Sequence, residues 1–425
     1  MTAPALAVPQ RRGACPGLSA PMPTGDGLLV RLLPVGTIGL DAFRELCAAA
    51  QRHGNGTVEI TSRGSIQIRG LGPVSAPRFA STIAVLGIVT DDGIPVLSNP
   101  LAGLDPDEMV DAGALAADTR RALARSDLAQ RLSAKISVAI DGGGALNVDH
   151  LPTDVRLRAE ASDAGAILAV SIGDGAEASE LGFVAPHDGS AAVVRLLETL
   201  ARHGRDARAR DAVAKHDTIA FRAAIADLVV NRSAERPPRP SCDPIGVHRL
   251  RGGTLACGVG LAFGHADANS LQRLAKAATA AGARGLRAAA GRALLVIDLQ
   301  PQSVPSLLAA AETLGFITRP DDPRRQVTAC AGAPICASAN IAARAMAPQI
   351  AAAIAARRDG ALKVHISGCA KGCAHPAPAA LTVVGTPQGC ALIAGGTTRD
   401  APFKVVAADE LPAAIVEFAA GARHV

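Results

Sequence analysis

The chain contains an internal repeat, and this feature restricts its possible folds more than any other. Residues 27–71 and 253–299 each read as strand, turn, amphipathic helix, strand, glycine turn and strand. The match continues further, because LGIVT at 86–90 corresponds to LGFIT at 314–318. Self-similarity of this kind indicates duplication of one structural unit. We therefore expect two small α+β layers, each with helices on one face of a sheet rich in Val, Ile and Leu.

A different kind of segment follows each repeat. The first has a helix near 107–124 and strands near 135–140, 154–160 and 166–172, and the second has a comparable order of one helix and several strands. The proline-rich stretch ERPPRPSCDP at 235–244 is typical of a linker between two halves. The sequence therefore predicts an internally duplicated α+β fold, arranged around a central groove.

Four of the nine cysteines are grouped in two pairs. Cys330 and Cys336 lie in TACAGAPIC, and Cys369 and Cys373 lie in GCAKGC, with thirty-two residues between Cys336 and Cys369. These spacings are wider than the C-x2-C pairs that usually hold a zinc ion. They suit a [4Fe–4S] cube, because each of its four irons takes one thiolate from a different direction. A structural zinc site and unrelated buried thiols remain as alternatives.

Glycines accompany the grouped cysteines at 332, 368 and 372, where they would let the backbone approach a cluster closely. The remaining cysteines are scattered, and for Cys47, Cys257 and Cys390 the simplest interpretation is a small buried hydrophobic residue. An odd number of cysteines without an export signal argues against a disulfide framework. The scattered cysteines are Cys15, Cys47, Cys242, Cys257 and Cys390.

The composition excludes several classes of function. Trp and Tyr are absent and only eight Phe occur, so recognition of nucleic acids by stacking on aromatic side chains is not expected. The net charge of +5 is a mild excess. No apolar run approaches the roughly 18 residues of a membrane span, and the first residues lack the apolar segment of a secretory signal. We expect a soluble cytoplasmic protein that binds neither nucleic acid nor membrane.

The repeat, TACAGAPIC and GCAKGC together resemble the nitrite and sulfite reductase superfamily, over nearly the whole chain. The resemblance implies that the four grouped cysteines hold the [4Fe–4S] cluster, and that Cys373 is the thiolate that joins it to an iron tetrapyrrole in the reductases. TSRGSIQIRG at 61–70 resembles the segment that lines the macrocycle. The implied segments are ferredoxin-like half-domains at 20–87 and 245–315, a reductase-like domain without a cluster at 88–234, and a cluster-binding domain at 316–425.

The chain departs from the reductases where they bind their small anion. Arg31 stands where one anion-binding arginine is expected, and Lys135 where the first of two lysines is expected. However, Ser137 replaces the second lysine, and residues 93–96 read GIPV without a cation. Losing half of these charges would weaken the reduction of an oxyanion in a water-poor site.

One branch of the superfamily fits better. Residues 11–32 and 135–159 resemble the precorrin-3B synthase family of oxygen-dependent cobalamin biosynthesis. The resemblance implies that dioxygen hydroxylates the tetrapyrrole precorrin-3A at C20, while an acetate side chain closes a γ-lactone. It also implies a mononuclear non-haem iron beside the cluster, with electrons that come ultimately from NADH. Because no G-x-G-x-x-G or flavin motif is present, we expect a separate, unidentified reductase to donate those electrons.

A substrate with many carboxylates requires guanidinium and ammonium groups around it. Strand alternation predicts that Arg63, Gln67 and Arg69 share one face, and that Arg156 and Arg158 project together. For each candidate the alternative is a solvated surface charge. No catalytic residue can be named, and His365 and His375 are expected to form local hydrogen bonds rather than to bind a metal. The candidate substrate-binding residues are Arg31, Arg63, Arg69, Lys135, Arg156, Arg158 and Lys371.

Two other functions stay open from the sequence. A sirohaem-dependent sulfite or nitrite reductase would carry a tightly bound, coloured macrocycle. A non-enzymatic electron-transfer module, or a zinc-stabilised interaction module, would share the cysteines without the large substrate groove. The resemblance also leaves open that Cys15 lies near the groove.

Overall fold

A computed structural model describes residues 16–421 except for 92, 164, 175–177, 217, 232–238, 240–241 and 356–361. Its strands form four sheets, which we number along the chain. Sheet 1 has the order β1-β2-β5-β4-β14, with bounds Met22–Thr24, Gly27–Leu32, Ile66–Leu71, Thr57–Ile60 and His265–Asp267. Sheet 3 has the order β12-β13-β16-β15-β3, with bounds Gly246–Arg249, Leu255–Gly260, Ala293–Leu299, Gly285–Ala289 and Ile38–Gly39.

Sheets 1 and 3 exchange an edge strand. In each repeat the strand that precedes the first helix leaves its own sheet, so that β14 of the second repeat pairs with β4 of the first, and β3 pairs with β15. The sequence predicted the repeat but not this exchange, because strand alternation identifies the face of a strand and not its partner. The two ferredoxin-like units are thus joined by backbone hydrogen bonds.

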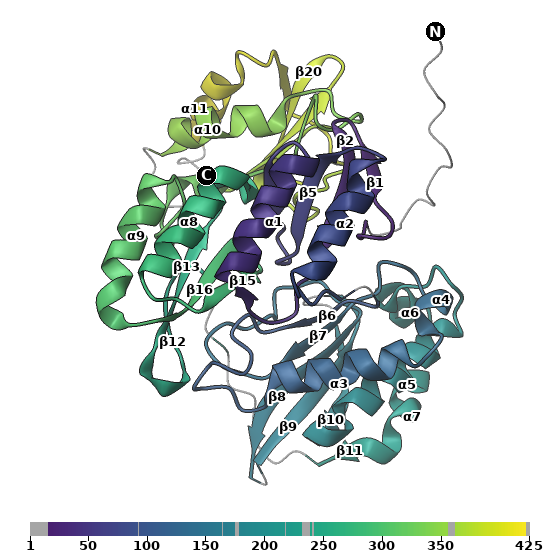
Figure 1. Cartoon of the computed structure of the whole chain (residues 1–425). Coiled ribbons are helices and arrows are strands. Elements are labelled where there is room, and N and C mark those ends of the chain that lie inside the picture. The colour runs from purple at the N-terminus through teal and green to yellow at the C-terminus, as the bar shows by residue number, and fades with distance from the viewer. Residues whose placement is uncertain are drawn as a thin grey trace.

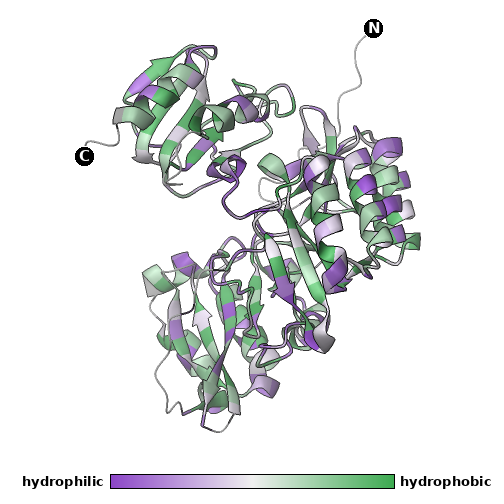
Figure 2. Ribbon diagram, turned by 90° about the vertical axis from the view of Figure 1, so that its left-hand side faces the viewer, coloured by the Kyte–Doolittle hydropathy of each residue, from purple (hydrophilic) through white to green (hydrophobic). Residues whose placement is uncertain are grey.

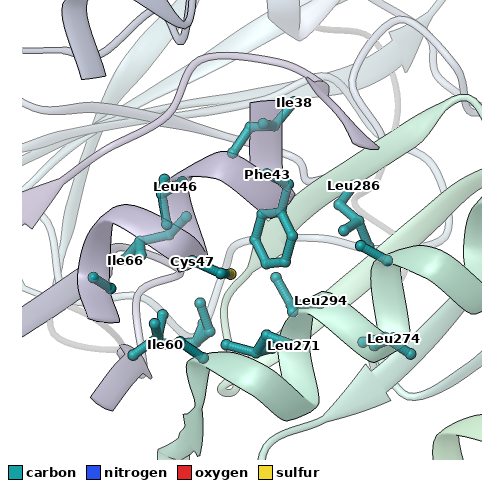
Figure 3. Packing of buried hydrophobic residues seen from close by; sticks show 14 of the residues in the cluster. Ile38, Phe43, Leu46, Cys47, Ile60, Ile66, Leu271, Leu274, Leu286 and Leu294 are labelled. Atoms are coloured by element: carbon teal, nitrogen blue, oxygen red, sulfur yellow. The ribbon is translucent and has the colours of Figure 1, made fainter. Parts of the chain in front are cut away.

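Helices α1 (Leu40–His53), α2 (Ser75–Val85), α8 (Ala268–Ala280) and α9 (Val304–Thr313) cover one face of this pair of sheets. Helices α1 and α8 pack against each other. Figure 3 shows Phe43 of α1 and Leu271 of α8 within one continuous group of buried side chains, to which both repeats contribute. A single shared hydrophobic core therefore holds the two units together.

Sheets 2 and 4 are also related by the duplication. In both, the first three strands in the chain are parallel and the later ones are antiparallel. Sheet 2 has the order β11-β10-β9-β8-β7-β6, with bounds Val229–Val230, Ser179–Val184, Gly165–Ile172, Val155–Ser162, Val138–Asp141 and Val96–Ser98. Sheet 4 has the order β17-β18-β19-β20-β21, with bounds Val327–Ala329, Val364–Ser367, Ala379–Thr386, Gly389–Gly396 and Lys404–Val406.

Helices pack on these two sheets as well. Sheet 2 carries α3 (Ala112–Ala124), α4 (Leu128–Arg131), α5 (Gly189–Ala201), α6 (Ala209–His216) and α7 (Ile219–Ala224), and sheet 4 carries α10 (Ala343–Ile354) and α11 (Leu411–Gly421). The helix expected near 107–124 begins only at α3, because the Asp111 side chain accepts a hydrogen bond from the Ala114 amide and caps it.

Both ribbon views place the pair formed by sheets 1 and 3 between sheet 2 on one side and sheet 4 on the other (Figures 1 and 2). Loop residues Leu101 and Leu146 from the sheet 2 region pack on residues of sheet 3. The β1–β2 turn meets residues of the sheet 4 region, since a Cβ atom on Gly25 would lie 2.7 Å from the Pro334 carbonyl oxygen. Among the described residues, no helix is both long and apolar enough to cross a membrane.

Candidate cluster and substrate site

The fold brings the four grouped cysteines to one edge of sheet 4. Cys330 directly follows β17, and Cys369 comes shortly after β18. These two strands are adjacent and parallel, so their carboxyl ends meet although the cysteines are far apart in the sequence. Burial raises the pKa of the Cys373 thiol, and the three other grouped cysteines raise it further. Cys373 therefore lies within electrostatic range of the three other grouped cysteines.

The backbone around these cysteines fits a cluster. The Gly368 amide donates to Cys330 Sγ at 3.1 Å, which is the kind of contact that stabilises a metal-bound thiolate. Gly332 has a φ of 71°, and a Cβ there would lie 2.3 Å from the Ala343 nitrogen. A Cβ on Gly368 would lie 2.6 Å from Ala339 Cβ. Glycine is thus required for close packing at both positions.

The donor set of the grouped cysteines consists of four thiols. In the described part of the chain, no group of three or more His, Cys, Asp or Glu side chains is placed to hold one metal ion. Four thiols match the donor set of a [4Fe–4S] cube, which takes one thiolate per iron. The residues present therefore fit the cluster predicted from the sequence.

The two histidines beside the cysteines differ in their surroundings. His375 Nε2 lies 3.4 Å from the Pro378 carbonyl oxygen, which is the local contact that the sequence analysis expected. His365 on β18 is only 1% exposed, and within the described structure neither of its ring nitrogens has a hydrogen-bond partner. The two rings meet edge to face, with centroids 5.6 Å apart. Burial, with smaller contributions from His375 and Arg292, lowers the pKa of His365 to about 4.

Two of the expected substrate-binding residues lie together. Arg31 is on β2, and Arg63, in the turn after β4, donates to the Pro152 carbonyl at 2.7 Å. Burial lowers the pKa of Arg63, and the neighbouring Arg208 and Arg31 lower it further. We call Arg31, Arg63 and Arg208 the basic junction, because they lie where the first repeat meets the sheet 2 region. Half-buried guanidinium groups that repel one another favour binding of an anion.

Arg208 was missed by the sequence analysis. It forms two hydrogen bonds with Asp154, of 2.9 and 3.0 Å, and it precedes α6 in a segment without a motif. No local pattern in the sequence identifies it, since its proximity to Arg63 depends on how two domains meet.

Arg156 and Arg158 project together from β8, as the alternation predicts, but both are engaged by acidic residues. Arg156 lies 3.5 Å from an Asp149 carboxylate oxygen and also donates to the Leu151 carbonyl. Arg158 lies 3.6 Å from Asp149 and 3.7 Å from Glu160. Their charges are therefore largely neutralised within the protein.

The other three candidates lie elsewhere. Arg69 departs most from the expectation, because its side chain is only 7% exposed and pairs with Asp26 through two hydrogen bonds of 3.0 and 3.2 Å. Lys135 lies on an exposed turn. Lys371, close to the grouped cysteines in the chain, donates to Ser338 Oγ at 2.9 Å. The seven candidates therefore do not form one site, and Cys15 lies outside the described residues.

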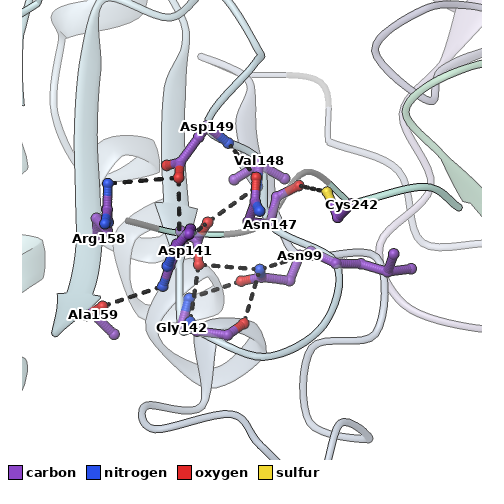
Figure 4. A network of polar contacts seen from close by, with 12 residues as sticks. Asn99, Asp141, Gly142, Asn147, Val148, Asp149, Arg158, Ala159 and Cys242 are labelled. Carbon is purple, nitrogen blue, oxygen red and sulfur yellow. Dashed lines mark hydrogen bonds and ion pairs between the residues drawn. The ribbon is translucent and has the colours of Figure 1, made fainter. Parts of the chain in front are cut away.

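The region of sheet 2 that corresponds to the cluster site is filled by protein. There, Asn99 donates to an Asp141 carboxylate oxygen at 3.2 Å and to the Leu146 carbonyl at 2.8 Å. Arg239, from the linker between the halves, lies 2.9 Å from the fully buried Asp141. Figure 4 shows Asn99 and Asp141 joined where the loops after β6 and β7 meet. In sheet 2, side-chain hydrogen bonds thus connect the loops that correspond to the cysteine-bearing loops of sheet 4.

Comparison with known proteins agrees with this architecture. Residues 20–84 match the family described as nitrite/sulfite reductase ferredoxin-like half domain. The chain is 38% identical to a precorrin-3B synthase from Sinorhizobium sp. over 395 residues, which cover 92% of this chain and 84% of that protein. This chain belongs to the precorrin-3B synthase family.

Sulfite and nitrite reductases of the wider superfamily are less similar in sequence to this chain than the precorrin-3B synthase is. A sulfite reductase [ferredoxin] from Mycobacterium tuberculosis is 25% identical over 372 residues, which cover 80% of this chain and 66% of that protein. The solved structure of the Mycobacterium tuberculosis NirA protein superimposes with a TM-score of 0.76 at 21% identity, and covers 92% of this chain and 80% of that one. The duplicated nitrite/sulfite reductase fold expected from the sequence is confirmed.

Proposed function

We propose that this chain hydroxylates precorrin-3A at C20 with dioxygen and closes the γ-lactone of precorrin-3B, in aerobic cobalamin biosynthesis. The observation that carries the proposal is the 38% identity to a precorrin-3B synthase over nearly the whole chain. Sulfite and nitrite reductases match at 24–25% identity only. The presence of GIPV at 93–96 and the exposed position of Lys135 also fit a substrate other than a small oxyanion.

The basic junction is where this chain would hold the carboxylates of the tetrapyrrole. Arg63 is the strongest candidate, because burial and neighbouring arginines already disfavour its charged form. A substrate carboxylate would neutralise that repulsion and accept paired hydrogen bonds from a guanidinium group. Arg31 would orient a further carboxylate, whereas Arg208 is already held by Asp154. Arg63 and Arg31 bind and orient the substrate; neither of them is placed to oxidise carbon.

Cys330, Cys336, Cys369 and Cys373 would hold a [4Fe–4S] cluster, which supplies single electrons when bound. In the proposed reaction, one atom of dioxygen enters the substrate and the other leaves as water. The two electrons that this requires would come from NADH through a separate reductase. The role of this chain is to bind the cluster and the tetrapyrrole substrate in fixed positions.

The mononuclear iron that the family resemblance implies finds less support in the side chains. Within the described ranges, no three potential ligands converge on one ion. We therefore assign no protein ligand to it and no step that depends on it.

The decisive experiment is anaerobic purification, followed by iron and sulfide analysis and by a reaction with precorrin-3A under labelled dioxygen. The expected result is about four irons and four sulfides per chain, and a product that gains one labelled oxygen atom. A bound macrocycle that reduces sulfite or nitrite would instead support the reductase alternative. A protein with a cluster but without either activity would support an electron-transfer module.

A further inference from the structure

A row of polar side chains crosses sheet 1 on the face opposite its core. Glu59 on β4 is 8% exposed, and its neighbours Val58 and Ile60 point into the core instead. Its Oε1 atom pairs closely with Arg344 Nη2 and lies 3.7 Å from Arg69 Nε. One buried carboxylate oxygen therefore serves two arginines from different parts of the chain.

The other oxygen of Glu59 continues the row toward the basic junction. Glu59 is paired with Gln67, and Gln67 is paired with Arg31, in the register of three adjacent strands. The Gln67 amide satisfies both neighbours when its oxygen faces Arg31. In that orientation its nitrogen donates to Glu59 Oε2 at 2.8 Å, and its oxygen accepts from Arg31 Nη2 and Nε at 2.7 and 2.9 Å. Gln67 thus links the carboxylate to the plane of the Arg31 guanidinium.

The same carboxylate reaches the loop that carries the first two grouped cysteines. We call residues 330–336 the cluster loop. Arg344 belongs to the first turn of α10, whose first residue touches Gly332 of the cluster loop. Arg69 lies 3.4 Å from the Ile335 carbonyl oxygen, to which its Nη2 donates, while Asp26 fixes the same guanidinium. Both arginines on Glu59 therefore contact the cluster loop or the helix that supports it.

The balance of positive and negative charge in this row depends on Glu59. Arg31, Arg69 and Arg344 carry three positive charges, and Asp26 and Glu59 carry two negative ones. Without the Glu59 charge, one carboxylate would face three cations in a poorly hydrated environment, where such imbalance is costly. Removal of this single charge should therefore disturb both ends of the row.

We propose that Glu59 is a positioning residue that fixes Arg31 through Gln67 and the cluster loop through Arg344 and Arg69. Glu59 thereby couples Arg31, which would contact the substrate, to the cluster loop, which would hold the cluster. The substrate side of this inference rests on the proposed function; the coupling between Arg31 and the cluster loop does not.

The test uses the cluster-loaded protein and two chemical readouts that need no substrate. The first is the rate at which phenylglyoxal modifies Arg31, measured by mass spectrometry, and the second is the rate at which a chelator removes iron. Glu59→Gln should raise both rates about tenfold, since each tenfold step corresponds to the loss of one modest interaction. Gln67→Met should raise only the Arg31 rate, and Arg344→Met mainly the rate of iron loss. Glu417→Gln is the matched control, because its exposed pair with Lys404 includes no residue of the row.

A carboxylate exchange makes the test specific to position. The double variant Glu59→Gln with Gln67→Glu returns a carboxylate to Arg31 but not to Arg344, so it should restore protection of Arg31 and leave iron loss fast. If Glu59→Gln changes only one readout, or if the exchange restores both or neither, the coupling is wrong. Binding of uroporphyrin III, an octacarboxylate tetrapyrrole, is measured separately. A wild-type protein that fails to bind it would contradict the substrate assignment and leave both chemical readouts valid.

Discussion

The Gly368 amide lies 3.1 Å from Cys330 Sγ, to which it donates, and this contact joins the loop after β17 to the loop after β18. It occurs because the two strands are parallel neighbours, which places the ends of both strands at one edge of sheet 4. The same glycine has no room for a side chain, since an added Cβ would lie 2.6 Å from Ala339 Cβ.

Gly368→Ala should therefore loosen the cysteine site. The new methyl group must push Ala339 away, which should lengthen the contact with Cys330 and weaken the hold on the cluster. We expect less iron and sulfide per chain and weaker visible absorbance after anaerobic purification. Gly39→Ala is the control, because a Cβ at that position meets nothing within 4 Å. Equal iron content in both variants would contradict the close packing described at Gly368.

Cys373→Ser should yield iron-poor protein. With one of four thiolates removed, one iron loses its protein ligand, and the two loops of sheet 4 lose a connection that metal binding supplies. We expect faster proteolysis of the C-terminal part, observed by gel electrophoresis and mass spectrometry. Cys242→Ser provides the comparison, because its thiol contacts the Asn147 carbonyl away from sheet 4. A fully metallated Cys373→Ser protein would rule out this cysteine as a ligand.

The cysteine site could be predicted from the sequence because its information is local. Two short motifs carry the four thiols, and a parallel strand pair is enough to bring them together. Arg31 and Arg63 stay candidates for the substrate site, and the family resemblance of their two short segments is what singled them out. Neither motif required knowledge of how the domains pack.

The roles of Arg69 and Arg208 could not be predicted, because each depends on a partner from elsewhere in the fold. Alternation placed Arg69 on the correct face but could not show that Asp26, in a distant turn, pairs with it. The proximity of Arg208 to Arg63 similarly requires the contact between two domains. The exchange of β3 and β14 belongs to the same class of feature, since both repeats contain the strand and only the assembled core decides its sheet.

Arg63→Ala should weaken substrate binding. The variant removes a half-buried cation that would meet a substrate carboxylate, so we expect KM to rise about tenfold with a smaller change in kcat. Arg63→Lys should recover part of the loss, because it restores the charge without the planar fork. Arg319→Ala is the control, since that side chain is 71% exposed and pairs with the exposed Asp321. An unchanged KM in Arg63→Ala would remove this arginine from the substrate site.

Asp141→Asn should destabilise the sheet 2 domain. Asp141 is fully buried and lies 2.9 Å from Arg239, so loss of its charge leaves the arginine without its main partner. Breaking a buried pair from one side costs about 3–5 kcal/mol. We expect the urea midpoint to fall, and the double variant with Arg239→Met to recover part of the loss. Disruption of the exposed Lys404–Glu417 pair should cost less than about 1 kcal/mol.

His265 should make the stability of the protein depend on pH. Burial lowers its pKa to about 4, and the adjacent Arg344 contributes to the shift. The unfolded chain, with an ordinary histidine pKa, binds a proton more readily than the folded one. Above about pH 6.5 the histidine is neutral in both states, so it does not reduce the free energy of unfolding there.

As the pH falls from about 6.5 to 4, the free energy of unfolding should fall, by about 3 kcal/mol in total. His265→Gln cannot be protonated, so it should unfold with a smaller change over this range when the two proteins are compared by urea titration. The comparison also removes the effect of acid on the grouped cysteines, because both proteins keep them. Identical pH profiles would show that His265 is protonated as easily in the folded protein as in the unfolded chain.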